Sequence, residues 1–504
     1  MTLTASPADF AAPVPAEGTE RDRAFQIVRP GRNCWRVARA DRATLLPDAA
    51  SYFARLEQTL KQAEHSILII GWDFDGRILL CPEGEVCQPL GSMLRSLVEQ
   101  KPNLRIHILV WSFAVVHAPS SPAQLLVGAD WQNHPRITLR LDQEHPIYAA
   151  HHQKIVCVDD RVAFAGGIDL TVKRWDTWRH KHNDRRRTDP DGQLYEPVHD
   201  MQMIVEGDAA TVVADVAKQR WKVATGEDLP TVSPVRDLWP NGLAPHFRDT
   251  DLAVARTLPE WGTQAPVQEV GRLTLDAIAA ARHCIYIEAQ YFANFDVAAR
   301  LADSLSKPEG PEIIVLMTHV LPAKLEQFIM GSNRDRVLRR LLRADRHGRF
   351  GAFYPTTPSE QGALDVLIHA KLMIIDDFFL RVGSANINNR SVGLDTECDL
   401  AIEAVNEEQR TTISTIRRQL LSSHLYAKPS ELADAVRQHG SAITAIRALQ
   451  KEGKGLNAFP PINLRGPTRP VIWTGILDPK RPLSATWQRF LKKRNRAARL
   501  AVSS

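Results

Sequence analysis

Two short segments of the chain each place a histidine two residues before a lysine. His152 and Lys154 form the first pair, and His369 and Lys371 form the second. An imidazole can attack an electrophile or carry a proton, and an ammonium group stabilises negative charge that develops in a transition state. Two such pairs in one chain predict a phosphoryl transfer site that uses neither a metal ion nor a cofactor.

Each pair is also followed by an aspartate, so both segments have the form H-x-K-x4-D. Residues i and i+2 of a strand project from the same face, so each histidine points the same way as its lysine. Asp159 and Asp376 belong to the motif and are therefore candidates alongside the catalytic residues. Their position at i+7, on the opposite face and at the far end of the strand, favours a structural role.

A turn rich in small residues follows each motif. The first turn contains Gly167 and Asp169, and the second contains Ser384 and Asn386. Glycine lets a backbone approach a ligand closely, and hydroxyl and amide groups donate hydrogen bonds. We expect these four residues to bind the phosphate.

Two neighbouring imidazoles can divide the reaction into two displacements. One, neutral, attacks phosphorus, while the other, protonated, gives a proton to the leaving alcohol and then takes one from water. A carboxylate behind each ring would fix its tautomer. Asp200 and Glu397 occupy matching positions at the start of a late strand and are the predicted orienting residues. The residues alone do not assign the two roles to His152 and His369.

The duplication extends well beyond the motifs. Segments 63–74 and 281–292 both run from the end of a polar helix into an apolar strand with a polar tip. The offset between the copies is 218 residues at His65 and His283, and 217 residues at the motif histidines. We predict an α/β fold of two homologous α/β sandwich halves, related by pseudo-two-fold symmetry, with the active site at their interface.

Composition and patterning suggest the domain limits. The predicted parts are a disordered N-terminal tail, a first half, a proline-rich linker, a second half and a basic helical C-terminal extension, at 1–34, 35–225, 226–250, 251–430 and 431–504. In the extension, Trp487, Phe490 and Leu491 lie on one helical face among many cations, which suits either a lipid anchor or a solvated helix. Trp72, Trp111, Trp175 and Trp178 are expected in the core rather than at a lipid-facing mouth.

The net charge of +5 over 504 residues suits an anionic partner without identifying one. The sequence has no run of about 18 apolar residues, and its first twenty residues lack the pattern of a secretion signal. We therefore expect a cytoplasmic protein that is peripheral at the membrane. Because both motifs lie in one chain, a monomer can hold the whole site.

The paired motifs resemble those of the phospholipase D superfamily, and those of phosphatidylcholine-type phospholipases D in particular. The similarity covers residues 35–425 and rests on segments 151–170, 197–203, 285–292 and 368–391. It implies phosphatidyl transfer to water or another alcohol through a phosphohistidine, with His152 as the nucleophile and His369 as the acid. The chain departs from the pattern at Ala289, where the subgroup usually has asparagine.

The predicted function is therefore hydrolysis of membrane glycerophospholipids to phosphatidate and free head group. The acceptor is water or an alcohol, the partner is a bilayer surface, and no nucleic acid is expected. Three alternatives remain. They are a cardiolipin synthase-like phosphatidyltransferase, a nuclease or other phosphodiesterase of the same superfamily, and a non-catalytic scaffold. The small net charge argues against a nuclease, and the two intact motifs argue against a scaffold.

Overall fold

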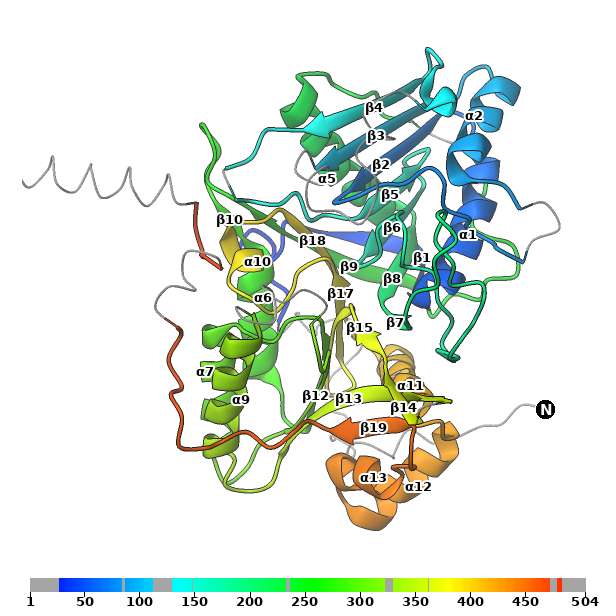
Figure 1. Ribbon diagram of the computed structural model, residues 1–504. Helices are drawn as coiled ribbons and strands as arrows, with labels where there is room; N and C mark the ends of the chain where they lie inside the picture. The colour runs from blue at the N-terminus through cyan, green and yellow to red at the C-terminus, as the bar shows by residue number, and fades with distance from the viewer. Residues whose placement is uncertain are drawn as a thin grey trace, which may run out of the picture.

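The computed structural model describes residues 27–83, 87–111, 129–146, 148–232, 236–321, 330–360, 362–471 and 478–482. In this part of the chain two α/β halves lie against each other, the N-terminal one at the top of Figure 1 and the C-terminal one below it. Among the helices described, none has the length and hydropathy that a bilayer span needs.

The first half is built on a mixed sheet. In spatial order its strands are β4 (Ile137–Asp142), β3 (Arg105–Trp111), β2 (Ser66–Gly71), β5 (Ile155–Val158), β6 (Val162–Gly166) and β8 (Met201–Glu206). The first three strands are parallel to one another, and each later pairing is antiparallel. These segments are rich in Val, Ile and Leu, as expected for strands that are buried on both faces.

The second half repeats this order and these directions. Its strands are β13 (Phe350–Ser359), β12 (Glu312–Met317), β11 (Cys284–Ala289), β16 (Lys371–Ile375), β17 (Phe379–Gly383) and β18 (Glu397–Glu403). Two further strands, β14 (Gly362–Asp365) and β19 (Gly455–Ala458), pair with β13. The repeat seen in the sequence is therefore a repeat in space, with β5 and β16 as the equivalent motif strands.

Two strands join the halves into one continuous sheet. β1 (Arg36–Pro47) pairs with β8 and with β9 (Phe247–Leu258), and β9 in turn pairs with β18. A short β10 (Val267–Gln268) pairs antiparallel with the end of β9. A second link is the parallel pair of β7 (Val198–His199) and β15 (Leu367–Ile368). These links hold the ends of the two motif strands together.

Helices cover the sheet in matching positions. In the first half α1 (Asp48–Gln62) and α2 (Leu90–Gln100) pack on one face, and α5 (Asp208–Thr225) packs on the other. In α1, Tyr52, Phe53, Leu56 and Leu60 recur at three- or four-residue spacing and are buried, which is the pattern of an amphipathic helix.

In the second half, one face carries α6 (Glu269–Ala280), α7 (Phe295–Leu305) and α9 (Ser332–Ala344). The other face carries α11 (Glu407–His424), α12 (Pro429–His439) and α13 (Ala442–Ala448). A one-turn α10 (Arg390–Gly393) follows the second small-residue turn.

The predicted limits differ from the structure at three places. Residues 27–34 belong to the fold, because Ile27 and Val28 are buried and their N–H groups bond to Glu403 in the second half. Strand β9 begins inside the predicted linker, and Leu238 and Trp239 of that linker are buried. The C-terminal extension contributes α13 and β19 to the second half, while its Trp487–Leu500 segment lies outside the described residues.

Candidate active site

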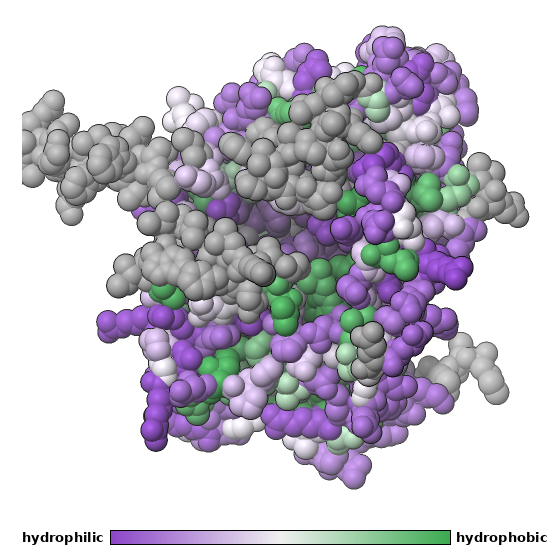
Figure 2. Space-filling view, in the orientation of Figure 1, coloured by the Kyte–Doolittle hydropathy of each residue, from purple (hydrophilic) through white to green (hydrophobic). Residues whose placement is uncertain are grey.

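The two motifs meet at the seam between the halves. His152 and Lys154 lie just before β5, and His369 and Lys371 lie at the equivalent end of β16. Both lysines are buried, and both histidines are only slightly exposed. The hydrophobic surface visible at the middle of the molecule, where the halves meet, is bordered by hydrophilic surface (Figure 2).

Each motif histidine is held by a carboxylate from the other half. Nδ1 of His152 lies 3.0 Å from Oε2 of Glu397, and Nδ1 of His369 lies 2.6 Å from Oδ2 of Asp200. A carboxylate that accepts from Nδ1–H leaves Nε2 of the neutral ring with a free lone pair. The sequence predicted these two carboxylates as orienting residues, but it did not show that they cross the seam.

Backbone bonds cross the seam beside each carboxylate. The His152 N–H donates to the Thr396 carbonyl at 3.1 Å, and the His369 N–H donates to the His199 carbonyl at 2.7 Å. Thr396 and His199 immediately precede Glu397 and Asp200. Each histidine and its carboxylate are therefore fixed to each other through both main chain and side chain.

The two lysines have different partners. Nζ of Lys154 forms an ion pair with Oδ2 of Asp169 at 3.0 Å. Nζ of Lys371 donates to Oε1 of Gln290 at 3.0 Å and to the carbonyl of His369. The Lys371 amino group therefore donates to two neutral oxygens, whereas Lys154 faces a carboxylate.

Burial and positive neighbours keep both imidazoles neutral in the empty site. Burial lowers the pKa of His152 well below its usual value, and Lys154 and Lys371 lower it further. Burial lowers the pKa of His369 in the same way, with contributions from Lys371, Arg174 and Lys154. Lysines of both halves act on each histidine, which agrees with a single shared pocket. A bound anionic phosphate would oppose these effects and favour a protonated ring.

The groups around the histidines also titrate near neutrality. Burial lowers the pKa of Lys371 to about 7, and it raises the pKa of Asp200 to about 6 and that of Glu397 to about 7. Clustered shifts of this kind are common at catalytic sites. The site thus holds several protons that can be redistributed when a charged substrate binds.

The structure corrects the inclusion of Asp159 and Asp376 among the catalytic candidates. Both lie at the far end of the motif strands, at φ of 50° and 49°. The Asp159 carboxylate accepts from the N–H groups of residues 64–66, and the Asp376 carboxylate accepts from those of residues 282–284. Each aspartate accepts hydrogen bonds from the backbone N–H groups at the start of the neighbouring strand. This is the structural role that its i+7 position favoured.

Three of the four predicted phosphate ligands have protein partners in the structure. The Gly167 N–H bonds to the Met201 carbonyl, Asp169 pairs with Lys154, and the Ser384 hydroxyl donates to Glu397 at 2.5 Å. A Cβ on Gly167 would overlap the Asp200 carboxylate, so this glycine is needed for close packing. Asn386 keeps a buried side-chain oxygen that has no partner among the described residues, and it stays a predicted phosphate ligand.

A buried network behind Asp200 was missed by the sequence reasoning. His199 Nδ1 lies 2.8 Å from Asp48, and its Nε2 lies 2.9 Å from Glu288 of the other half. His424 lies 3.3 Å from Glu288 as well. Burial opposes protonation of His199, but the two carboxylates raise its pKa well above the usual value. A charged His199 therefore lies between a carboxylate of the first half and one of the second. The His-Asp pair in segment 197–203 was the one sequence signal for this network.

The same network contains the two sets of side chains in the described residues whose spacing would suit a metal ion. They are Asp48, His180 and His199, and His199, Glu288 and His424. The separations of 2.8 and 2.9 Å between His199 and its two carboxylates are those of hydrogen bonds, which already satisfy both ring nitrogens.

Comparison with known proteins defines the class of this fold and site. A family model described as phospholipase D matches residues 59–238, and one described as cardiolipin synthase, PLD-like domain, matches residues 274–419. These two ranges fall on the two halves of the structure. The chain therefore belongs to the phospholipase D superfamily.

Individual relatives agree with this assignment. Phospholipase D A of Dictyostelium discoideum is 25% identical over 445 residues, which are 74% of this chain and 33% of the relative. Phospholipase D alpha 4 of Arabidopsis thaliana is 24% identical, with 81% of this chain and 67% of the relative covered. The chain thus spans about a third of the length of the first of these relatives and about two thirds of the second.

A solved structure supports the fold alone. The phosphatidylserine synthase of Haemophilus influenzae matches 81% of this chain and 94% of its own, with a TM-score of 0.52 and 13% identity. The alignment covers most of both chains, so the two-half architecture is common to them.

Proposed function

We propose that this protein is a phospholipase D-type phosphodiesterase, which cleaves the bond between phosphate and head group in membrane glycerophospholipids. The observation that carries the proposal is the crossed arrangement in which Asp200 and Glu397 orient the histidines of opposite halves beside two buried lysines. The names of the relatives, phospholipase D A and phospholipase D alpha 4, support the same reaction.

The first displacement transfers the phosphatidyl group to the protein. Nε2 of neutral His152 attacks phosphorus, and the bond from phosphorus to the head-group oxygen breaks. His369, protonated once the anionic phosphate is bound, gives its Nε2 proton to the departing oxygen. Lys154 and Lys371 offset the negative charge that gathers on the phosphoryl oxygens.

The second displacement regenerates the protein. Nε2 of His369, now neutral, takes a proton from water while the water oxygen attacks phosphorus. The bond from phosphorus to His152 Nε2 breaks, and phosphatidate leaves. Another alcohol in place of water gives a new phosphodiester through the same steps, so exchange of the head group needs no further residue.

The proposed setting is a bilayer surface to which the protein binds peripherally from the cytoplasm. One chain carries both motifs, so we propose that a monomer is active. The proposed site uses no metal ion, and no nucleic acid is a substrate.

A second candidate differs only in the acceptor. The match of residues 274–419 to a model described as cardiolipin synthase favours a phosphatidyltransferase, in which a lipid hydroxyl replaces water in the second displacement. The positions of the histidines, lysines and carboxylates serve both reactions equally. The identity of the product is therefore what separates the two candidates.

The test is product analysis by mass spectrometry after incubation with phosphatidylcholine and phosphatidylethanolamine vesicles in EDTA, with and without a primary alcohol. Phosphatidate and free head group support hydrolysis, a phosphatidyl alcohol supports exchange, and cardiolipin from added phosphatidylglycerol supports the second candidate. His152→Ala and His369→Ala should each abolish turnover. Cleavage of DNA or RNA in the absence of lipid products would refute the proposal.

A further inference from the structure

The net positive charge of this protein is concentrated in one loop of the first half. Residues 173–187, which we call the basic loop, contain seven lysines and arginines and two aspartates. Their net charge of +5 equals that of the whole 504-residue chain, so the remaining residues sum to zero. The second half has no counterpart, because α10 follows directly on its small-residue turn.

The start of the basic loop lies at the catalytic site, and the loop is anchored there. The charge of Arg174 contributes, after burial and Lys371, to the lowered pKa of His369. Asp176 is fully buried and binds His180 at 3.0 Å and Arg187 at 3.1 Å, and it accepts from the Val198 N–H at 3.0 Å. These bonds hold both ends of the loop next to β7, the strand that immediately precedes Asp200.

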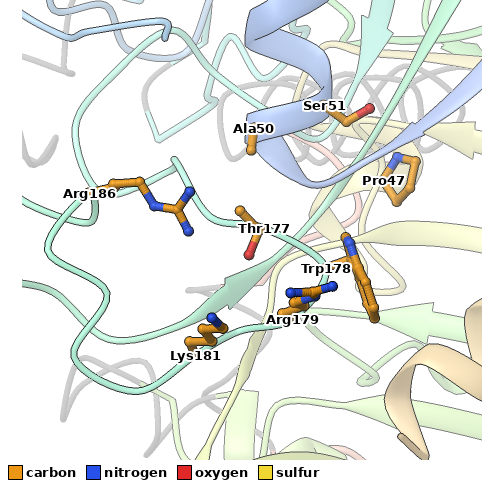
Figure 3. Close-up of a pocket in the computed structure, with 8 residues that line it drawn as sticks. All are labelled: Pro47, Ala50, Ser51, Thr177, Trp178, Arg179, Lys181 and Arg186. Carbon is orange, nitrogen blue, oxygen red and sulfur yellow. The ribbon is translucent and has the colours of Figure 1, made fainter. Parts of the chain in front are cut away.

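The middle of the basic loop faces solvent. Trp178 is 55% exposed, and the Arg179 guanidinium lies 4.9 Å from the centre of its ring. Together with the start of α1 they form an open pocket of about 380 Å³. Figure 3 shows the residues that line it, which are Pro47, Ala50, Ser51, Thr177, Trp178, Arg179, Lys181 and Arg186.

Several cations of the basic loop are available to a partner. Arg186 is committed to Asp184 and Glu83, and Arg187 to Asp176. Within the described part of the chain, the other five cations of the loop have no carboxylate at ion-pair distance, namely Lys173, Arg174, Arg179, Lys181 and Arg185. An exposed tryptophan beside unpaired cations matches the chemistry of the bilayer interface, where an indole lies among head groups and cations meet anionic phosphates.

We propose that the basic loop is the docking site for a bilayer containing anionic phospholipids, with Trp178 at the interface and Arg179 and Lys181 on lipid phosphates. This inference rests on the proposed function and adds the surface through which the protein meets its substrate. Nucleic acid would also attract the cations. The exposed tryptophan, and the short path along the loop from Trp178 to Arg174 at the catalytic site, favour a lipid surface.

The test measures vesicle binding separately from catalysis. The full chain carrying His152→Ala is sedimented with vesicles of phosphatidylcholine alone or mixed with phosphatidylglycerol, so that the lipid is not consumed. At roughly fivefold per cation, Arg179→Gln with Lys181→Gln should weaken binding to the mixed vesicles about 25-fold. Trp178→Ala should weaken binding to both vesicle types.

Matched controls come from exposed residues elsewhere in the first half and in the segment that follows β9. Arg105→Gln with Arg140→Gln removes two exposed cations from β3 and β4, and Trp261→Ala removes another exposed tryptophan. These variants should bind as the parent does. In the catalytically intact protein, the loop variants should hydrolyse a soluble short-chain lipid at the parent rate.

Some results would overturn the proposal. They are parent-like vesicle binding by the Arg179 and Lys181 variant, equal binding to both vesicle types by the parent, or tighter binding to a DNA oligonucleotide than to the mixed vesicles. The proposed function can fail independently. Vesicle binding that depends on the loop, without head-group release, would refute the enzyme activity but support the docking site. Normal hydrolysis of short-chain lipid, with vesicle binding that does not depend on the loop, would support the enzyme activity but refute the docking site.

Discussion

Replacing Asp200 with asparagine should separate the two displacements. In the structure Oδ2 of Asp200 faces Nδ1 of His369 at 2.6 Å, and Oδ1 accepts from the Met201 N–H at 2.7 Å. The backbone N–H can bond only to the oxygen of an asparagine, so the amide NH2 is directed at the imidazole. Nδ1 must then accept, and the ring proton moves to Nε2.

This change of tautomer affects the two steps differently. Neutral His369 with its proton on Nε2 cannot take a proton from water. It is also too weak an acid to protonate an alcohol head group, so only a leaving group that needs no proton, such as p-nitrophenolate, still departs. By analogy with the loss of a comparable carboxylate in serine proteases, steady-state turnover should fall by about 10³–10⁴-fold, or roughly 4–5.5 kcal/mol. The side chain is buried and nearly isosteric, so packing is preserved.

Rapid quenching of Asp200→Asn with phosphatidyl-p-nitrophenol is the appropriate assay. We expect a burst of p-nitrophenolate close to one per chain, followed by slow turnover, with phosphohistidine accumulating at His152. Glu397→Gln gives the opposite control, because it disturbs the tautomer of the attacking ring and should remove the burst. Unchanged steady-state turnover in Asp200→Asn would refute the orienting role, and loss of its burst would exchange the roles of the two histidines.

Three further predictions follow from the geometry and the charges of the site. Asp159→Ala and Asp376→Ala each leave three backbone N–H groups without their acceptor, so urea unfolding should show a loss of about 3 kcal/mol, with kcat unchanged in the folded protein. A catalytic loss larger than the stability loss would contradict their structural role. The dependence of kcat/KM on pH should be a narrow bell centred near 7. It should fall on the acid side as Glu397 (pKa about 7) and then Asp200 (pKa about 6) are protonated, and on the alkaline side as Lys371 (pKa about 7) loses its proton. A flat profile from pH 5 to 9 would contradict this. Gly167→Ala should displace the Asp200 carboxylate and lower kcat at least tenfold while the far-ultraviolet circular dichroism stays the same. Full activity would show that the carboxylate has room to move.

The repeated pattern of the sequence predicted the two halves, because the repeat is recorded in local spacing. The motif strands, the closing strands and the offset of 217 or 218 residues all correspond to equivalent elements. In contrast, the sequence did not predict that Asp200 and Glu397 contact the histidines of the opposite halves. It depends on the pairing of β7 with β15 and of β1 with β9, which no local pattern encodes.

The small-residue turns show that the polar type of a residue does not identify the partner of its side chain. Asp169 and Ser384 are polar and close to the site, yet their side chains bind Lys154 and Glu397. Gly167 suits a close approach, but the group that approaches it is the Asp200 carboxylate. Partners that are distant in sequence decide such roles, and only the folded chain shows them.

The central claim, one phosphate pocket shared by both halves, is tested most directly by counting phosphohistidines. The wild-type protein would be quenched without acid during turnover of phosphorus-labelled lipid. It would then be digested and analysed by mass spectrometry. A shared pocket predicts at most one labelled histidine per chain, at His152. Label on both His152 and His369 of the same chain would mean two independent sites and would contradict it.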